Sequence, residues 1–359
     1  MSKRQLAMVM DLNKCIGCQT CTVACKTQWT NRNGREYMYW NNVETFPGEG
    51  YPKNWQNLGG GFDEAGDLKD GTIPNLEGNY GVPWDFNHDE VAQSKPFSPE
   101  QDPKWGPNWD EDEGAGQFPQ DNYFFYIPRI CNHCDNPGCL SACPRDAIFK
   151  RDADGVVLVD LDRCQGYRYC IAGCPYKKIY FNPKISKSEK CILCFPRIEK
   201  GLPPACAQQC VGRIRLVGFL DDETSQVHQL VKKHKVALPL RSDFNTGANI
   251  YYIPPVLAPP KYDAHGKIIE NSTRIPKEEL ETLFGEDVHR VIKTLKGELE
   301  NRANNKESEI LDMLIGFKHK EMFKLDSNYY AEEFGMKPVD ARYFKGKNTL
   351  KFTSFKAVH

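Results

Sequence analysis

Cysteine spacing is the feature that most constrains how this chain can fold. The sequence of 359 residues holds 15 cysteines, and all of them fall into four short groups. The groups are Cys15, Cys18, Cys21 and Cys25; Cys131, Cys134, Cys139 and Cys143; Cys164, Cys170 and Cys174; and Cys191, Cys194, Cys206 and Cys210. Thiolate is the ligand that iron–sulfur clusters require, and a C-x-x-C-x-x-C loop presents three sulfurs to one cluster while a fourth comes from elsewhere. The spacing therefore predicts a chain folded around iron–sulfur clusters.

The third group is one ligand short. It reads C-x-x-Y-x-x-C-x-x-x-C, with Tyr167 where a cysteine is expected. A phenol is a poor ligand for a thiolate-type cluster, so we expect three [4Fe-4S] clusters and one [3Fe-4S] cluster. A fourth cube completed by water or hydroxide is the alternative.

Two other uses of cysteine compete with this interpretation. Disulfides are typical of small secreted chains, but this chain is long and its thiol count is odd. Structural zinc takes four ligands per site, and fifteen thiols do not divide into fours. Pro144 and Pro175 directly follow Cys143 and Cys174, as in the Cys-Pro ending of bacterial ferredoxin motifs. The pattern favours clusters over a zinc-stabilised scaffold.

Composition and charge argue against other classes of protein. A net charge of −1 and a pI of about 6.7 give no basic face for nucleic acid. No apolar run reaches the roughly 20 residues needed to span a bilayer. After Lys3 and Arg4, residues 5–10 are too few for the apolar core of a signal peptide. We expect a periplasmic subunit that is exported already folded with a signal-bearing partner, or alternatively a cytoplasmic protein.

Strands and helices are predicted around the cysteine groups. Apolar, strand-like runs precede the first three groups at residues 6–12, 123–127 and 156–161. Short helical stretches are expected at residues 22–29, 140–148 and 171–180. The fourth group precedes a strand at residues 213–220. This repeat of strand, cysteine loop and helix is the half-unit of a ferredoxin-like fold.

The predicted fold class is α+β, with two ferredoxin-like modules of the tandem bacterial-ferredoxin type. Residues 1–29 and 184–220 form the two halves of module 1, and residues 123–183 form module 2. Residues 30–122 form a loop-rich insertion, and residues 221–359 a partly helical C-terminal extension.

The insertion and the C-terminal extension each contain patterns that predict local structure. In the insertion, Gly59, Gly60 and Gly61 predict a turn, and the acidic residues 110–113 a solvated loop. In the extension, residues 251–260 are expected to be extended, and residues 276–300 and 307–317 to be helical. The apolar faces of these helices are expected to pack on the core of this chain. Alternatively, because the extension has little room for a core of its own, they wrap a partner subunit.

Several side chains are expected to lie beside the clusters and tune them. Lys14, Arg163 and Lys190 each precede the first cysteine of a group, where positive charge would raise the reduction potential of a cluster. His133 lies between two ligand cysteines and is expected to be a neighbour of the cluster rather than a ligand. Tyr167 is also expected to lie beside a cluster.

Four motifs together resemble a known family. They are K-C-I-G-C-Q-T-C-T-V-A-C-K at residues 14–26, Y-M-Y-W-N-N-V-E at 37–44, P-N-W-D-E-D at 107–112 and R-I-C-N-H-C at 129–134. With the C-x-x-Y-x-x-C variation, they resemble the iron–sulfur beta subunit of the type II dimethyl sulfoxide reductase family of molybdenum enzymes, over essentially the whole chain. The likeness is greatest to the ethylbenzene dehydrogenase beta subunit and those of related hydrocarbon hydroxylases. Beta subunits of dimethyl sulfide dehydrogenase and of selenate, chlorate, perchlorate and nitrate reductases are the alternatives, although nitrate reductase typically has Trp in place of Tyr167.

The resemblance implies how the cysteines are shared among clusters. Three [4Fe-4S] clusters would be bound by Cys15, Cys18, Cys21 and Cys210; by Cys25, Cys191, Cys194 and Cys206; and by Cys131, Cys134, Cys139 and Cys174. The [3Fe-4S] cluster would be bound by Cys143, Cys164 and Cys170, at the far end from the first cluster.

The resemblance also implies a function. The chain would conduct electrons between a molybdenum (bis-pterin) catalytic alpha subunit and a haem b gamma subunit, with no direct membrane span of its own. The sequence shows neither a nucleophile–base arrangement nor a dinucleotide fingerprint, which agrees with a subunit that is not catalytic alone. A free polyferredoxin, or the electron subunit of a formate dehydrogenase or hydrogenase, would explain the cysteines equally well but the insertion and extension less readily.

Overall fold

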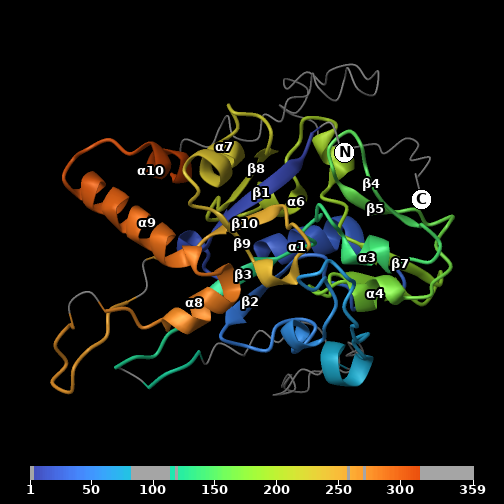
Figure 1. The fold of residues 1–359 in the computed structure, drawn as a ribbon, viewed down its shortest axis with the longest axis horizontal. Helices are drawn as coiled ribbons and strands as arrows, with labels where there is room; N and C mark the ends of the chain where they lie inside the picture. The colour runs from blue at the N-terminus through green and yellow to red at the C-terminus, as the bar shows by residue number, and fades with distance from the viewer. Residues whose placement is uncertain (1–3, 82–113, 118–119, 257–258, 270–271, 316–359) are drawn as a thin grey trace, which may run out of the picture.

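A four-stranded sheet lies at the centre of the molecule (Figure 1). The computed structural model describes residues 4–81, 114–117, 120–256, 259–269 and 272–315. The strand order is β8 (Arg215–Phe219), β1 (Leu6–Asp11), β10 (Ile250–Ile253) and β9 (Leu238–Pro239). β1 pairs antiparallel with β8 and parallel with β10. All six residues of β1 are buried, which explains why this strand reads as a nearly continuous apolar run.

The strands predicted before the cysteine groups are confirmed, with small shifts at their ends. β1 ends one residue early, β3 (Phe125–Arg129) begins two residues late, and β5 (Val157–Val159) is shorter than expected. β8 supplies the strand predicted after the fourth group. The content of helix and strand is mixed, as an α+β fold requires, while the detailed arrangement as two tandem modules stays a prediction.

Two of the predicted helices are much too long. The first helical stretch is α1 (Thr20–Cys25), which continues as the π-helical turn η2 (Lys26–Thr30). α3 (Gly138–Ser141) and α4 (Tyr169–Gly173) are each about one turn, and strands follow them. Proline explains the early end, because Pro144 and Pro175 lack the N–H that a continuing helix would need. The residues beyond them form two hairpins, β4 (Ile148–Lys150) with β5 and β6 (Ile179–Asn182) with β7 (Lys187–Lys190).

The remaining short helical elements connect these parts. They are η1 (Leu12–Lys14), η3 (Trp55–Asn57), η4 (Leu76–Tyr80), α5 (Phe195–Ile198), α6 (Ala205–Gln208), α7 (Gln226–His228), η5 (Gln229–Lys233) and η6 (Ser242–Phe244). No helix in the described ranges is long and apolar enough to cross a membrane.

The insertion contains a strand that sequence reasoning missed. β2 (Asn42–Phe46) pairs antiparallel with β3, so the insertion is joined to the segment that carries the second cysteine group. The turn predicted at the three glycines is confirmed, since all three have positive φ. It also packs closely on α4: a Cβ on Gly60 would lie 2.6 Å from the carbonyl oxygen of Ala172, so the backbone can approach only without a side chain. The acidic residues 110–113 lie outside the described residues.

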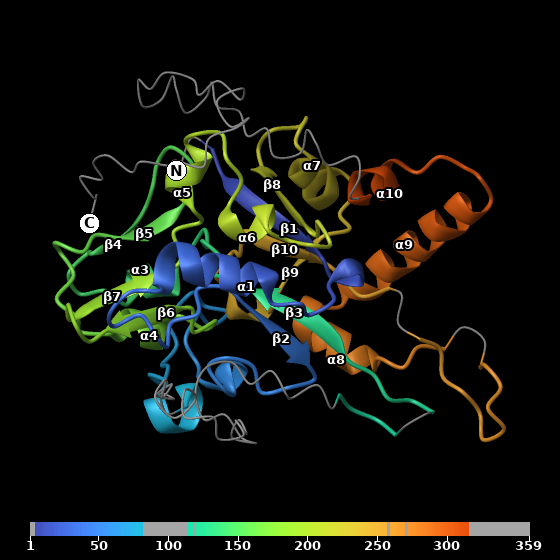
Figure 2. The ribbon, with the colours of Figure 1, turned by 180° about the vertical axis from the view of Figure 1, so that it is seen from behind.

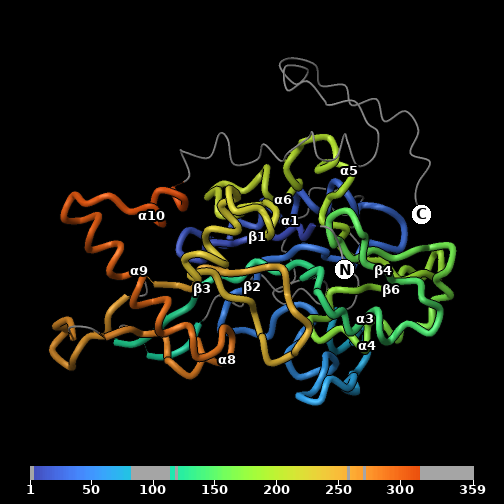
Figure 3. The backbone as a smooth tube through the Cα atoms, turned by 45° about the horizontal axis from the view of Figure 1, so that its top comes forward, coloured from blue at the N-terminus to red at the C-terminus, as the bar shows by residue number. Residues whose placement is uncertain are grey.

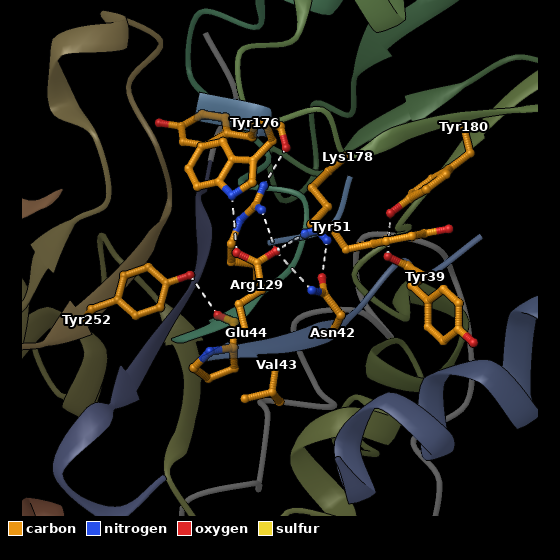
Figure 4. Close-up of polar contacts among 12 residues, drawn as sticks. Tyr39, Asn42, Val43, Glu44, Tyr51, Arg129, Tyr176, Lys178, Tyr180 and Tyr252 are labelled. Atoms are coloured by element: carbon orange, nitrogen blue, oxygen red, sulfur yellow. Dashed lines mark hydrogen bonds and ion pairs between the residues drawn. The ribbon is translucent and has the colours of Figure 1, made fainter. Parts of the chain in front are cut away.

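A buried ion pair joins the two-stranded sheet of β2 and β3 to the rest of the protein (Figure 4). Arg129 Nη1 donates to Glu44 Oε1 at 2.6 Å, and both side chains are almost fully buried. The same carboxylate accepts the N–H of Tyr51 at 2.9 Å and of the Trp55 indole at 3.1 Å. Arg129 Nη2 donates to the carbonyl of Tyr176 at 2.6 Å. The pair therefore connects β2, β3 and the chain just after α4.

The C-terminal extension contributes two strands, β9 and β10, to the central sheet. The segment expected to be extended at 251–260 overlaps β10, which pairs with β1 along the middle of the sheet. Beyond it come α8 (Lys277–Phe284), α9 (Asp287–Ala303) and α10 (Glu309–Leu314), which confirm the predicted helical stripes. Gly285, with φ of +77°, separates α8 from α9.

The three C-terminal helices and the α3–α4 region lie at opposite ends of the molecule. The view from behind and the tilted tube show the same separation, with the sheet between them (Figures 2 and 3). The buried face of the helices packs on the main core through Leu283, Val288, Val291 and Leu295. The ring of Phe284 in α8 lies against that of Tyr252 in β10, so the helices pack beside the β10 and β9 edge of the sheet.

We expect Glu44→Ala to lower the free energy of unfolding by about 3–5 kcal/mol, because it leaves Arg129 as a buried charge without its partner. Urea or thermal unfolding followed by circular dichroism measures the change. The matched control is Glu49→Ala, since the Glu49 carboxylate is 47% exposed and pairs with Lys53 at 3.0 Å. An exposed pair of this kind contributes about 0–1 kcal/mol. Equal losses in the two variants would contradict a structural role for the buried pair.

Candidate metal centres

The four cysteine loops share a backbone feature. The second residue after the first cysteine of each loop has positive φ: +66° at Gly17, +44° at His133, +72° at Gly166 and +48° at Leu193. Positive φ is uncommon outside glycine, so His133 and Leu193 are held in this conformation by their surroundings. Turns of this kind direct successive backbone N–H groups into a concave surface, which is found at iron–sulfur and phosphate sites. The backbone is therefore shaped alike in all four loops.

This shared conformation puts Tyr167 at the loop position of the second cysteine. Its counterparts are Cys18, Cys134 and Cys194. The match to the first loop extends one residue further, because Gln19 and Arg168 also have positive φ. The Tyr167 side chain is 56% exposed and lies largely at the surface. The residue thus occupies a ligand position of the backbone while its phenol is turned mostly toward solvent.

Three hollows in the structure are each lined by four cysteines. Site 1 is lined by Cys15, Cys18, Cys21 and Cys210; site 2 by Cys25, Cys191, Cys194 and Cys206; and site 3 by Cys131, Cys134, Cys139 and Cys174. The space between the atoms that line them is similar, about 330, 300 and 360 Å³ when the part open to solvent is included. Every set combines three cysteines from one stretch of chain with a fourth that is distant in sequence.

The three remaining cysteines also lie together, and we call them site 4. Burial raises the pKa of the Cys170 thiol to about 12, and the nearby thiolates of Cys164 and Cys143 act in the same direction. The backbone N–H of Ala147 points at Cys143 Sγ at 3.4 Å, and that of Ser188 at Cys164 Sγ at 3.5 Å. Site 4 therefore has three thiols with backbone donors directed at two of them.

The four sites form a row. Thiols of adjacent sites lie close enough for one thiolate to raise the pKa of the other, although burial is the larger cause in every case. The coupled pairs are Cys21 with Cys206, Cys131 with Cys191, and Cys174 with Cys170. Site 1 is thus next to site 2, site 2 to site 3, and site 3 to site 4.

The residues around the hollows fit a large, sulfur-rich inorganic group. Burial raises the pKa of Cys15 and of Cys206 to about 12, so a positively charged metal centre is needed to keep them as thiolates at neutral pH. His133 Nε2, at site 3, and Trp40 Nε1, at site 2, are buried and have no hydrogen-bond partner among the residues that the structure describes. Among the described residues, no three Cys, His, Asp or Glu side chains are grouped to bind a single metal ion. The thiols are spread around the hollows instead.

The side chains expected beside the clusters have different surroundings. Lys190 is buried, its ammonium donates to the carbonyls of Val157 and Cys191, and its charge lowers the pKa of thiols in sites 2 and 3 against the larger effect of burial. His133 is fully buried at site 3, and its Nδ1 accepts the N–H of Val157 at 3.1 Å. Both lie where a residue that tunes a cluster would be.

The other two basic residues have partners away from the sulfurs. Lys14 lines site 1, but its ammonium donates to the carbonyl of Leu314 and lies 3.6 Å from Asp11. The Arg163 side chain is 65% exposed and pairs with Asp160 at 3.4 Å. In this structure, Lys14 ties site 1 to α10, and Arg163 lies at the surface.

Two donors to cysteine sulfur were missed by sequence reasoning. Arg215 Nη2 lies 3.3 Å from Cys21 Sγ, and the indole N–H of Trp29 lies 3.1 Å from Cys194 Sγ. Neither residue is adjacent to a cysteine in sequence, so a search limited to the flanks of the motifs does not find them. The one available signal was a charge inside an apolar strand, since β8 reads R-L-V-G-F and is buried throughout.

Comparison with protein families supports the metal assignment. A model of the 4Fe-4S binding domain matches residues 6–27, and a model of the 4Fe-4S dicluster domain matches residues 122–220. The prediction that this chain binds iron–sulfur clusters is thereby confirmed, while the assignment of individual cysteines as ligands stays a prediction. The number of clusters of each type stays a prediction.

Curated proteins similar to this chain are beta subunits of redox enzymes. The chain is 60% identical to dimethylsulfide dehydrogenase subunit beta from Rhodovulum sulfidophilum, over 90% of this chain and 100% of that protein. It is 54% identical to the beta subunits of selenate reductase from Thauera selenatis and of chlorate reductase from Ideonella dechloratans, over 90% of this chain and 99% of each relative. These relatives belong to the group named above as alternatives, and the finer likeness to ethylbenzene dehydrogenase is not shown by them.

We expect Trp29→Phe to lower the reduction potential of the cluster at site 2, because the variant loses the N–H that points at Cys194 Sγ. Redox-poised EPR spectroscopy on the purified protein measures the shift. The clusters at the other sites serve as the reference within the same sample, since Trp29 lines only site 2 among the three hollows. An unchanged potential with the cluster intact would show that this contact has no electronic role.

Proposed function

Because this chain belongs to the iron–sulfur beta subunits of the type II dimethyl sulfoxide reductase family, we propose that it relays electrons between a molybdenum catalytic subunit and a haem b subunit. The observation that carries the proposal is the row of four thiol sites. When bound, the clusters supply one-electron steps along this row. The chain's own residues hold and insulate these centres, and the bond chemistry belongs to the catalytic subunit.

The proposal assigns a cluster to each site. Sites 1, 2 and 3 each hold a [4Fe-4S] cluster, since each has four thiols around a hollow of similar size. Site 4 holds a [3Fe-4S] cluster, since it has three thiols and Tyr167 at the fourth loop position. This distribution uses every cysteine of the chain.

Exposed apolar side chains lie beside both end sites. Next to site 1, Ile16 is 64% and Val211 63% exposed, and Cys18 is itself exposed. In the chain around site 4, Tyr167 and Tyr169 are 56% and 58% exposed. Apolar residues gathered on a surface often mark a protein interface. We propose that the site 1 surface faces the molybdenum subunit and the site 4 surface the haem b subunit.

The proposed location is the periplasm. Each site joins cysteines from remote segments, so only a folded chain can hold the clusters. Export would therefore carry the folded subunit together with a signal-bearing catalytic partner. Cell fractionation with an antibody to this chain tests the location, and a purely cytoplasmic pool in cells that assemble the active complex would contradict it.

Two parent enzymes are proposed. The length of the chain and its C-terminal extension favour an ethylbenzene dehydrogenase-like hydrocarbon hydroxylase, whereas the 60% identity to a dimethylsulfide dehydrogenase subunit favours dimethyl sulfide oxidation. The purified complex decides between them by its oxidation of ethylbenzene or of dimethyl sulfide with an artificial electron acceptor. Activity toward neither compound, together with reduction of selenate or chlorate, would move the chain to the branch of oxyanion reductases.

We expect Tyr167→Cys to convert the three-iron centre into a cube with a lower potential, because a thiolate then occupies the fourth loop position. The EPR signal of the oxidised three-iron centre should disappear, and iron content should rise from about fifteen to about sixteen atoms per chain. The matched control is Tyr169→Cys, a neighbouring exposed tyrosine outside the loop position, which should change neither. Persistence of the three-iron signal in Tyr167→Cys would contradict the assignment of site 4.

We expect the double variant Ile16→Asp with Val211→Asp to weaken binding to the molybdenum subunit by at least about tenfold, because it places charge in an apolar interface. Co-purification on the tagged catalytic subunit measures the retained fraction. The control is Leu76→Asp, which changes a side chain that is 54% exposed on η4 in the insertion. If the double variant and the control are retained equally, the site 1 surface is not the docking surface.

A further inference from the structure

Arg215 is a buried cation that lies between two of the cysteine sites. It begins β8, and its side chain is completely buried. Nη2 lies 3.3 Å from Cys21 Sγ of site 1 and donates to Asn41 Oδ1 at 2.7 Å. The guanidinium also lies close enough to Cys206 of site 2 to be influenced by its charge. One side chain therefore faces both sites.

The charge of Arg215 has no carboxylate partner among the described residues. Its neighbours through hydrogen bonds are an amide oxygen and two sulfurs, including Met8 Sδ at 3.9 Å. Its Nε is buried and has no partner at all within the described structure. A guanidinium stays protonated in proteins, so Arg215 is a buried cation. A buried cation in this position needs anionic groups in sites 1 and 2 for its compensation.

We propose that Arg215 is an electrostatic element shared by two clusters, which raises the reduction potentials at sites 1 and 2 together. The guanidinium stabilises the added electron at either site, because it contacts Cys21 of site 1 and lies within electrostatic reach of Cys206 of site 2. Its effect does not extend to sites 3 and 4. The inference rests on the ligand sets proposed above.

The shared neighbours of Arg215 distinguish it from the other donors to sulfur. Trp29 contacts a thiol of site 2 only, and it is neutral. Lys190 is the corresponding cation between sites 2 and 3, but its ammonium donates to two backbone carbonyls. Arg215 alone in the described structure combines full burial, positive charge, a contact with cysteine sulfur and an N–H without a partner.

The test uses the purified complex with Arg215→Gln, Arg215→Lys or the control Arg213→Gln. The control residue lies two positions earlier, is exposed and donates to the carbonyl of Gln208 at 2.7 Å. Its substitution removes the same charge from the same segment without altering a residue that touches a site. Redox-poised EPR gives the midpoint potential of each cluster, and iron analysis gives the occupancy.

We expect Arg215→Gln to shift the potentials at sites 1 and 2 to lower values together and to leave those at sites 3 and 4 unchanged. Arg215→Lys keeps the charge and should restore both potentials toward those of the wild type. Arg213→Gln should shift none. If Arg215→Gln loses iron from sites 1 and 2, retention of iron by Arg215→Lys with near wild-type potentials supports the same conclusion.

Three results would overturn the proposal. They are unchanged potentials in an iron-replete Arg215→Gln complex, a shift at only one of the two sites, and equal shifts in Arg215→Lys and Arg215→Gln. The wild-type complex in the same experiment tests the proposed function separately, because the number and type of its clusters do not depend on the role of Arg215.

Discussion

The constraint on which this structure depends is that every four-cysteine site is closed by a residue from a remote part of the chain. Site 1 takes its fourth thiol from Cys210, and site 2 takes its fourth from Cys25. The two exchanges hold α1 against α6, although each helix is too short to be stable alone. Cysteines are themselves largely buried, so metal ligation and core formation are the same event in this part of the protein.

The buried network around Glu44 holds separate chain segments together beside site 3. The shared cysteines have the same effect at sites 1 and 2. Lys178 donates to Asn42 in this network and also lines site 3 (Figure 4). Burial, and after it the charge of Arg129, lowers the pKa of Lys178 to about 7. Arg129 forms the ion pair with Glu44, whereas Lys178 reaches this carboxylate only through the amide of Asn42. The lowered pKa of Lys178 reduces its repulsion with Arg129. The network holds the two-stranded sheet of β2 and β3 beside site 3 through hydrogen bonds rather than through thiols.

Sequence reasoning reached the parts of the structure that local chemistry determines. Cysteine spacing indicated where the four loops are, and apolar runs located β1, β3 and β8. It missed β2, because that strand buries Asn42 and Glu44, whose partners come from elsewhere in the chain. The overlong helices came from following apolar periodicity past Pro144, where a helix cannot continue. The role of Arg215 was missed for a related reason, since only the folded sheet brings β8 alongside the first cysteine loop.

The parallel pairing of β1 with β10 has a consequence for biosynthesis. Met8 pairs with Ile250, so one of the first segments to leave the ribosome waits for one of the later ones before its sheet is complete. The thiols of residues 15–25 wait in the same way for Cys206 and Cys210. Domains usually form in the order of synthesis, from the N-terminus onward. Here the earliest thiols to emerge are among the last to be enclosed, so the nascent chain must be kept reduced until most of it has been made.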